Sequence, residues 1–347
     1  DMDSLTARPN ILKQANLSLI RRVIKAKGTS TRAEIAIETR ISSTTVRSLL
    51  SEMLENGEIE SIGLDESSGG RKAQRYRLNP EFCYGAAFCL FEDHVVFLLV
   101  NIYGEIAEKE ELKIQDGNVR QTLLSFLDDL IEKKEIKSIG LGVPGIVENG
   151  CYWKKSKEDG NMYKSDIGIF LSERYQLPVI MENDINATAI GFGRCYAKEF
   201  PEENPEDTNM AFLHFEEHCV SAGFISAGRI IRGCGNFAGE LGLLPVDADR
   251  LLDECMMDPM DDVQYVNLMI KILSWVCGIL NPAYIALGGP ALRPDCIGAV
   301  SDGLSALLPG HMAAEILYSP DVRHDYYDGL ASLTAGRIFE EIQFIRE

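Results

Sequence analysis

Near residue 80 the chain changes both the spacing of its apolar residues and the sign of its charge. Before this point, apolar residues recur every three or four positions, as on amphipathic helices. After it, apolar runs typical of buried strands alternate with helical stretches. Residues 1–80 hold 13 Lys and Arg against 10 Asp and Glu, whereas the remainder holds 21 against 43. Because a basic module attracts a polyanion and an acidic one repels it, we expect any nucleic acid to be bound by the first 80 residues alone.

The first 80 residues predict three helices followed by a β-hairpin. Apolar residues at helical spacing indicate helices over 16–26, 32–39 and 41–57, and a glycine ends the third. Strands are expected over 58–63 and 75–79, joined by a glycine-bearing tip with Arg71 and Lys72. The third helix has an apolar stripe at i, i+3, i+4 and i+7, which leaves a short polar face pointing outward. That face carries Thr44, Thr45, Arg47 and Ser48.

This arrangement is typical of a winged helix-turn-helix domain. In such a domain the exposed start of the third helix fits the major groove, and the hairpin tip lies against the phosphate backbone. We therefore expect Arg47 to reach a base edge, and Arg71 and Lys72 to lie along phosphates. A three-helix protein-interaction module with solvated charges on its faces remains the alternative.

Composition narrows the class of protein. With 347 residues and 46% hydrophobic content, the chain can bury a core large enough for two or three domains. Nine cysteines without a C-x-x-C pair argue against a disulfide framework and against a four-thiolate zinc site. The first residues lack a secretory signal pattern, and no apolar run approaches the roughly 18 residues of a membrane span. We therefore expect a cytoplasmic protein with reduced cysteines and no membrane segment.

The stretch M-E-N-D-I-N-A-T-A, residues 181–189, places an acid-amide-acid run between an apolar segment and helix-forming residues. Asp184 has two interpretations at such a strand-to-helix crossing. Its carboxylate can cap the helix by accepting the first amide protons, or it can bind a ligand hydroxyl. The two roles are compatible, because one carboxylate can accept both hydrogen bonds.

Several motifs stand in a fixed order along the chain. I-S-S-T-T-V-R-S-L-L and S-S-G-G-R-K in the first 80 residues are followed by I-G-L-G-V-P-G-I-V at 139–147, then by L-P-V-I-M-E-N-D-I-N-A-T-A at 177–189. R-G-C-G-N-F-A-G-E-L-G at 232–242 and L-N-P-A-Y-I-A-L-G-G at 280–289 complete the series. Together they resemble the ROK family, which pairs sugar-responsive repressors with sugar kinases of the same fold, and the resemblance covers nearly the full chain.

The resemblance implies an α/β fold class. A winged helix-turn-helix domain over residues 1–80 would be followed by a two-lobed actin-like fold of the ribonuclease H-like, sugar kinase type. The first lobe would span residues 81–190 and the second 191–347, with the last helix returning to the first lobe.

The resemblance also bears on catalysis. In kinases of this family a carboxylate matching Asp184 acts as base on the sugar hydroxyl, which requires a positioned nucleotide. The first phosphate loop, D-x-G-G-T, corresponds here to a stretch with Ala87 near the aspartate position. The second, G-T-G-I-G, aligns with E-H-C-V-S at 217–221. Without glycines the backbone cannot approach phosphates closely, and Glu216 and Glu217 add negative charge. We therefore expect no ATP binding and no enzymatic activity.

A ligand pocket is nevertheless implied. By the resemblance, Asn183, Asp184 and Glu240 would bind sugar hydroxyls, with Gly145 of the P-G turn beside them. Leu243 stands where the family has a histidine that touches both sugar and zinc, and the family's cysteine-rich zinc motif is missing. We therefore expect no metal and no cofactor, and a ligand that is a sugar or a related metabolite.

The expected function is a transcriptional regulator, most simply a repressor, of carbohydrate metabolism genes. Its partners would be double-stranded operator DNA and a carbohydrate-like effector, and paired DNA half-sites would require a homodimer or homotetramer. Two alternatives remain open. One is an active sugar kinase with a regulatory head, and the other is a DNA-binding dimer that senses no ligand.

Overall fold

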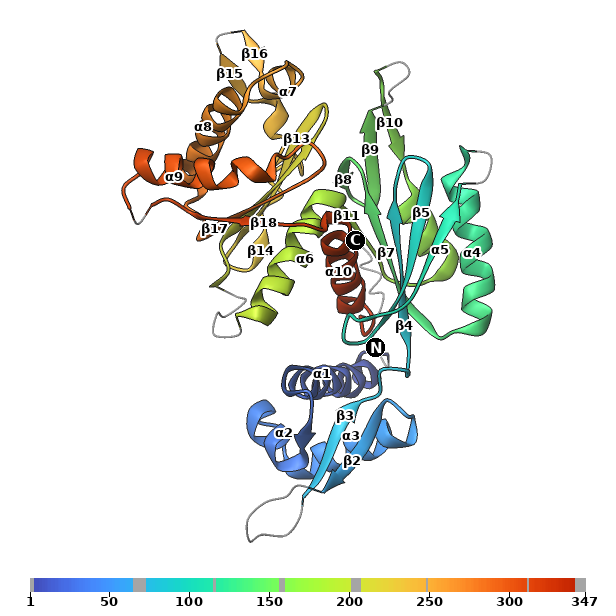
Figure 1. Cartoon of the computed structure of the whole chain (residues 1–347). Helices are drawn as coiled ribbons and strands as arrows, with labels where there is room; N and C mark the ends of the chain where they lie inside the picture. Colours follow the sequence, from blue (N-terminus) through green and yellow to red (C-terminus); the bar gives the residue numbers. More distant parts are fainter. Residues whose placement is uncertain are drawn as a thin grey trace.

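A computed structural model describes residues 3–64, 73–114, 117–155, 160–200, 207–247, 249–310 and 312–340. A small N-terminal head lies below a body made of two lobes (Figure 1). The boundary expected at residue 80 falls between the last strand of the head, which ends at Leu78, and the first strand of the body, which starts at Tyr84. The boundary expected at residue 190 falls inside one continuous helix, Asp184–Glu199.

The head contains the three helices and two long strands expected from the periodicity. Its elements are α1 (Asp3–Lys27), β1 (Ser30–Thr31), α2 (Arg32–Thr39), α3 (Ser43–Glu55), β2 (Ile59–Leu64) and β3 (Gln74–Leu78). The strands form an antiparallel sheet in the order β1-β3-β2. The expected apolar stripe of α3 is buried: Val46, Leu49, Leu50 and Met53. Helix α1 begins 13 residues earlier than expected, and Arg71 and Lys72 lie outside the described residues.

The first lobe is built on a five-stranded sheet in the order β11-β7-β4-β5-β6. Its strands are β4 (Tyr84–Leu90), β5 (His94–Asn101), β6 (Ile106–Lys113), β7 (Ile136–Val143) and β11 (Val179–Asn183). Strands β4, β5 and β6 pair antiparallel, whereas β7 and β11 add in parallel. Helices α4 (Val119–Lys133) and α5 (Ile167–Tyr175) contribute buried residues to the apolar cluster on one face of this sheet.

The second lobe repeats this topology. Its strands are β12 (Met210–Glu216), β13 (Cys219–Ser226), β14 (Arg229–Ile230), β17 (Tyr284–Gly288) and β18 (Glu315–Tyr318). The order β14-β13-β12-β17-β18 again joins three antiparallel strands to two parallel ones. Helices α8 (Asp262–Leu280) and α9 (Ile297–Leu307) pack on its outer face, near α7 (Leu252–Met256) and the small hairpin of β15 (Pro245–Asp247) and β16 (Arg250–Leu251).

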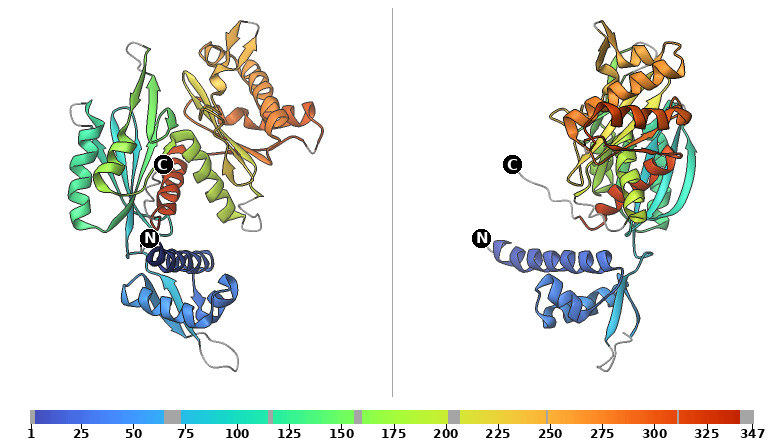
Figure 2. Two further views of the ribbon diagram at one scale, coloured as in Figure 1. Left: turned by 180° about the vertical axis from the view of Figure 1, so that it is seen from behind. Right: turned by 60° about the vertical axis from the view of Figure 1, so that its left-hand side comes forward.

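Two helices, α6 (Asp184–Glu199) and α10 (Val322–Gly336), lie side by side between the two sheets (Figures 1 and 2). Their backbones touch because glycines stand at the crossing. A Cβ on Gly191 would come 1.8 Å from the Asp325 carbonyl oxygen, and one on Gly329 would come 1.8 Å from the Ala187 carbonyl oxygen. Helix α6 packs on the second sheet and α10 on the first, so this helix pair carries the contact between the lobes.

A second, three-stranded sheet extends the first lobe next to the cleft. Its strands, β8 (Ile146–Glu148), β9 (Cys151–Lys155) and β10 (Met162–Ser165), form an antiparallel meander that the sequence pattern does not predict. These strands are short, and β10 is mostly exposed, so neither alternation nor a continuous apolar run marks it. The sheet positions Val147 and Asn149 beside β11.

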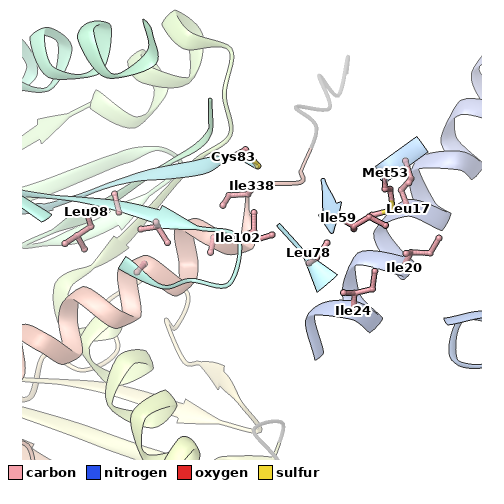
Figure 3. Close-up of a cluster of buried hydrophobic side chains, with 14 of the residues drawn as sticks. Leu17, Ile20, Ile24, Met53, Ile59, Leu78, Cys83, Leu98, Ile102 and Ile338 are labelled. Atoms are coloured by element: carbon pink, nitrogen blue, oxygen red, sulfur yellow. The ribbon is translucent and has the colours of Figure 1, made fainter. Parts of the chain in front are cut away.

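The head and the body share one buried apolar cluster. It runs from Leu17, Ile20 and Ile24 of α1 through Leu78 of β3 to Ile102 and to the residues of α10 (Figure 3). The hydroxyl of Tyr103 donates a hydrogen bond of 3.0 Å to the Leu78 carbonyl oxygen. The Arg21 guanidinium lies 4.3 Å from the centroid of the Phe339 ring. The head is therefore held to the body by packing as well as by the chain connection.

Among the described helices, α8 alone is long and apolar enough to cross a membrane by length and composition. The expectation that no segment reaches this length is therefore wrong for α8. One face of the helix, which includes Tyr265, Met269, Ile272, Leu273, Val276 and Cys277, is buried in the core of the second lobe.

Candidate functional site

The exposed start of α3 presents a polar surface on the head. Thr44, Arg47 and Ser48 are exposed, whereas Thr45 is partly buried. The hydroxyls of Thr45 and Ser42 lie 2.8 Å apart, and Ser42 caps α3 by accepting the Thr45 backbone N–H at 3.2 Å. Of the four expected contact residues, Thr45 is therefore the one whose hydroxyl is already used within the helix. The other three side chains are open to a partner.

In the body, the M-E-N-D-I-N-A-T-A stretch forms the end of β11 and the start of α6. Asn183, not Asp184, is the N-cap residue of α6. Its Oδ1 accepts the backbone N–H groups of Ile185 at 2.9 Å and Asn186 at 3.1 Å, and its Nδ2 donates to the Gly145 carbonyl oxygen at 3.1 Å. Asp184 is the first helical residue, and its Oδ1 also accepts the Ile185 N–H at 2.9 Å. The capping interpretation thus applies mainly to Asn183.

A cavity of about 440 Å³ lies between the lobes at the end of β11, and we call it the Asn183 cavity. Arg232 and Asn236 reach it from the second lobe, and the remaining walls come from β8, the turn after it, α5, β11 and α6. Its lining residues are Val147, Asn149, Gly150, Gly168, Ile169, Ser172, Glu173, Val179, Met181, Glu182, Asn183, Asn186, Arg232 and Asn236. Its size falls in the range of small-molecule sites.

Asp184 faces a different cavity, of about 610 Å³, which we call the Asp184 cavity. It includes Phe91 from the β4–β5 turn and Glu216 from the end of β12. These two turns are where the family resemblance places the phosphate loops. The residues with polar or charged side chains that line the cavity are Asp184, Thr188, His214, Glu216, Tyr318, Ser319, Asp321, Arg323 and Tyr326. The described lining of this cavity thus contains three carboxyl groups and one guanidinium.

The acidic surroundings change the protonation of this second site. Burial, reinforced by Glu216 and Glu240, raises the pKa of Asp184 to about 7. Burial also lowers the pKa of His214, an effect that the nearby Glu216 carboxylate opposes. At neutral pH the Asp184 carboxyl is therefore only partly ionised, and the imidazole is mainly neutral. The site holds little positive charge that could offset a polyanion.

The structure separates the four residues expected in one ligand pocket. Asn183 lines the first cavity and Asp184 the second, while Glu240 is not among the described residues that line either of them. Burial, with a contribution from Asp253, raises the pKa of Glu240. The backbone of Gly145 has a φ of +134°, and a Cβ added there would come 2.2 Å from the Trp153 carbonyl oxygen. The Gly145 carbonyl oxygen accepts the hydrogen bond from Asn183 Nδ2. A single pocket that contains all four residues is therefore not what the structure shows.

The structure adds three functional candidates. Glu182 lies directly before Asn183, is almost fully buried, and pairs with Arg232 of the second lobe. The amide of Asn236 donates to the Val147 carbonyl oxygen across the same cavity. All three stand inside the quoted motifs, so the motifs mark the region. No local pattern shows that residues 50 positions apart meet.

A metal site is not evident in the part of the chain that the structure describes. No group of three or more His, Cys, Asp and Glu side chains is placed there to hold an ion. Leu243, in the position of the family's histidine, is half exposed, and Cys255 and Cys277 are buried free thiols.

Comparison with known proteins places this site in a family context. Residues 92–258 match the profile of the ROK family. The chain is 28% identical over 241 residues to a xylose repressor of Caldicellulosiruptor bescii. The aligned segment covers 67% of this chain and 59% of that protein. It is 23% identical over 252 residues to the transcriptional dual regulator NagC of Escherichia coli, covering 69% of this chain and 59% of NagC. The match thus spans about three fifths of each relative's length.

Solved structures show the same fold over more of the chain. A ROK family transcriptional regulator, a homolog of the Escherichia coli MLC protein, superposes with a TM-score of 0.63 at 17% identity, over 93% of this chain and 99% of that one. A ROK family glucokinase from Streptomyces griseus, in complex with glucose and AMPPNP, superposes with a TM-score of 0.53 at 15% identity. That match covers 73% of this chain and 99% of the glucokinase.

Proposed function

We propose that this chain, in which residues 92–258 match the ROK family profile, is a DNA-binding transcriptional repressor of carbohydrate metabolism genes whose body senses a sugar or related metabolite. The names of its relatives, a xylose repressor and the regulator NagC, support this role. The repressor would act in the cytoplasm as a homodimer or homotetramer, because paired half-sites require paired heads.

The observation that carries the DNA-binding role is the exposed start of α3 on a basic head. Helices α2 and α3 are joined by a three-residue turn in which Arg40 adopts a left-handed conformation, φ 57°. The order of three helices followed by an antiparallel hairpin fits a winged helix-turn-helix module. Arg47 then lies on the helix that would enter the major groove, and Arg71 and Lys72, which fall between β2 and β3 in the sequence, would contact phosphates.

The test compares DNA sequences selected by the purified protein with random DNA, using fluorescence anisotropy. Arg47→Ala should lower the ratio of specific to random binding, whereas Arg71→Ala should weaken both alike. Arg22→Ala, which removes an exposed charge from α1, is the matched control. Equal losses on both DNAs for Arg47→Ala would count against the groove assignment, and a monomer in light scattering would count against paired half-sites.

We propose further that the body does not catalyse phosphoryl transfer. Asp184, Glu216 and Asp321 outnumber Arg323 in the cavity where the phosphate loops would lie, and this charge repels a nucleotide. A second candidate function, a sugar kinase, is favoured by the raised pKa of Asp184, which suits a general base. Calorimetry with ATP in millimolar magnesium, together with an assay for phosphorylated sugars, separates the two. Binding of ATP or formation of a product would restore the kinase.

The effector-sensing role rests on the Asn183 cavity, which presents amide, hydroxyl and carboxyl groups from both lobes. Uncharged amide and hydroxyl groups of this kind can exchange hydrogen bonds with the hydroxyls of a ligand. A sugar that binds the folded state should raise the melting temperature by mass action. If no metabolite does so while operator binding persists, the protein is instead a DNA-binding dimer that senses no ligand.

A further inference from the structure

The end of β11 holds one carboxylate whose hydrogen bonds are almost entirely internal. Glu182 is only 2% exposed. Its Oε1 accepts the backbone N–H of Asn183 at 3.1 Å and the side-chain Nδ2 of Asn186 at 3.0 Å. Its Oε2 accepts Nε of Arg232 at 3.1 Å and a second guanidinium N–H of the same residue. With two donors on each oxygen, this carboxylate has little capacity left for a ligand.

Arg232 is the single cation among the described residues that line the Asn183 cavity. It extends from the second lobe to Glu182 of the first, and its guanidinium donates two hydrogen bonds to that carboxylate. Its charge is thereby balanced inside the protein. Its side chain is still 44% exposed, so guanidinium N–H groups remain that can donate to a ligand in the cavity. Arg232 thus acts as a hydrogen-bond donor more than as a free positive charge.

The rest of the lining is neutral or acidic. Asn149, Ser172, Asn186 and Asn236 offer uncharged polar groups, and four apolar side chains (Val147, Ile169, Val179 and Met181) form a surface suited to the C–H groups of a sugar ring. Glu173, on α5, is exposed at the edge. The N-terminus of α6 does not offer free amides there, because Asn183 Oδ1 already accepts two of them. An unpaired cation, one of the usual attractions for a phosphate, is therefore absent from the described residues of this lining.

We infer that the Asn183 cavity selects a neutral polyol, meaning a sugar without a phosphate or carboxylate group, and that the Glu182–Arg232 pair sets this selectivity. A neutral sugar can accept hydrogen bonds from Arg232 without disturbing the pair. A sugar acid or sugar phosphate would have to compete with Glu182 for Arg232 and would lie close to Glu173. The inference rests on the proposed effector role for the existence of a ligand, and it adds the ligand's charge and the residues that read it.

The experiment measures binding of matched neutral and anionic sugars to the full chain by isothermal titration calorimetry. The neutral probes are D-xylose, D-glucose, N-acetylglucosamine and sucrose. The anionic probes are D-glucuronate, glucose 6-phosphate and N-acetylglucosamine 6-phosphate. We expect at least one neutral sugar to bind, and its anionic counterpart to bind at least tenfold more weakly.

Two substitutions test the role of the pair. Glu182→Gln keeps an acceptor for Asn183 and Asn186 but leaves the Arg232 charge unbalanced, so the preference should shift at least tenfold toward the anionic sugar. Arg232→Gln should weaken the neutral sugar about tenfold and should not improve anion binding. Arg229→Gln removes an exposed arginine that precedes this segment and is the matched control, with no expected change. If Glu182→Gln does not fold, the sugar affinities of the wild-type protein and of Arg232→Gln still test the inference.

The possible failures can be told apart. A wild-type preference for a phosphorylated or carboxylated sugar would overturn this inference while leaving a sugar-responsive repressor intact. An unchanged preference in both Glu182→Gln and Arg232→Gln would overturn the role of the pair. Absence of binding by every probe would overturn the inference together with the effector role, whereas DNA binding by the head is measured separately and would stand.

Discussion

The head is joined to the body mainly by apolar contacts, whereas polar contacts cross the cleft between the two lobes. At the junction, apolar side chains from α1, β3 and α10 belong to one cluster, and Leu78 and Ile102 are fully buried in it (Figure 3). A groove of about 490 Å³ borders this core. In the cleft, the walls of both cavities are rich in charged and amide groups, and the Glu182–Arg232 and Asn236–Val147 contacts cross from lobe to lobe.

This difference indicates where movement costs most. Opening the junction would expose apolar surface, at roughly 25 cal/mol per Å². Opening the cleft breaks a few polar contacts that water or ligand hydroxyls can replace, so the net cost is about 0.5–1.5 kcal/mol for a neutral hydrogen bond and about 1.5–3 kcal/mol for one to a charged group. The cleft is therefore the part suited to ligand exchange, and the junction is the part that would transmit a change in the body to the head.

The largest expected effect is at the junction, from Arg21→Met. Arg21 Nε and Glu58 Oε1 are 2.5 Å apart, and the Glu58 side chain is only 6% exposed. Removing the guanidinium leaves a buried carboxylate without its counter-charge and also removes the contact with Phe339, so unfolding should become easier by about 3–5 kcal/mol. Denaturant titration measures this. Lys27→Met, which breaks an exposed pair with Glu38, should cost about 0–1 kcal/mol. A similar small value for Arg21→Met would contradict the description of the junction.

Leu78→Ala should come next. This side chain is fully buried where β3 leads into the body, and truncation should lower stability by about 2–5 kcal/mol because the cavity cannot collapse completely. Leu307→Ala, at a residue that is 59% exposed at the end of α9, is the matched control and should stay within about 0.5 kcal/mol. Equal effects of the two substitutions in thermal unfolding would mean that the head is not held by this core.

In the cleft, Asp184 should make stability depend on pH. Folding raises the pKa of its carboxyl from about 3.9 to about 7, so the folded state binds the proton more tightly. The associated stability is present in full below about pH 4 and is lost as the pH rises through about 7. Asp184→Asn removes this dependence, so its stability relative to wild type should increase between pH 5 and pH 8, by about 1–4 kcal/mol. A constant difference across this range would contradict the raised pKa.

The smallest effect should come from Asn183→Ala. The substitution removes the acceptor for two α6 amides and the donor to Gly145, and loss of an N-cap typically costs about 1 kcal/mol. Asn183→Ser retains a good capping group and should recover most of that stability in denaturant titration. If Ser is as destabilising as Ala, the link to Gly145 matters more than the cap.

Local elements were predictable where the apolar residues recur at a single spacing. The apolar stripe of α3 follows from the spacing of its residues alone. The β8–β10 sheet was not predictable, because its strands are short and their pairing partners provide most of the order. The site residues remain a prediction. Asn183 and Asp184 were identified, but their division between two cavities was not.

The sequence by itself determined the change of charge near residue 80, the helical face of α3 and the polar strand-to-helix crossing at Asn183 and Asp184. These depend on residue type and spacing, which act locally. Only the tertiary structure decided which polar groups meet. Consecutive residues at the start of a helix point about 100° apart, so Asn183 and Asp184 line different cavities. Glu182 and Arg232, 50 residues apart, meet only because α6 and α10 hold the two lobes together, and burial then requires the carboxylate to have a partner.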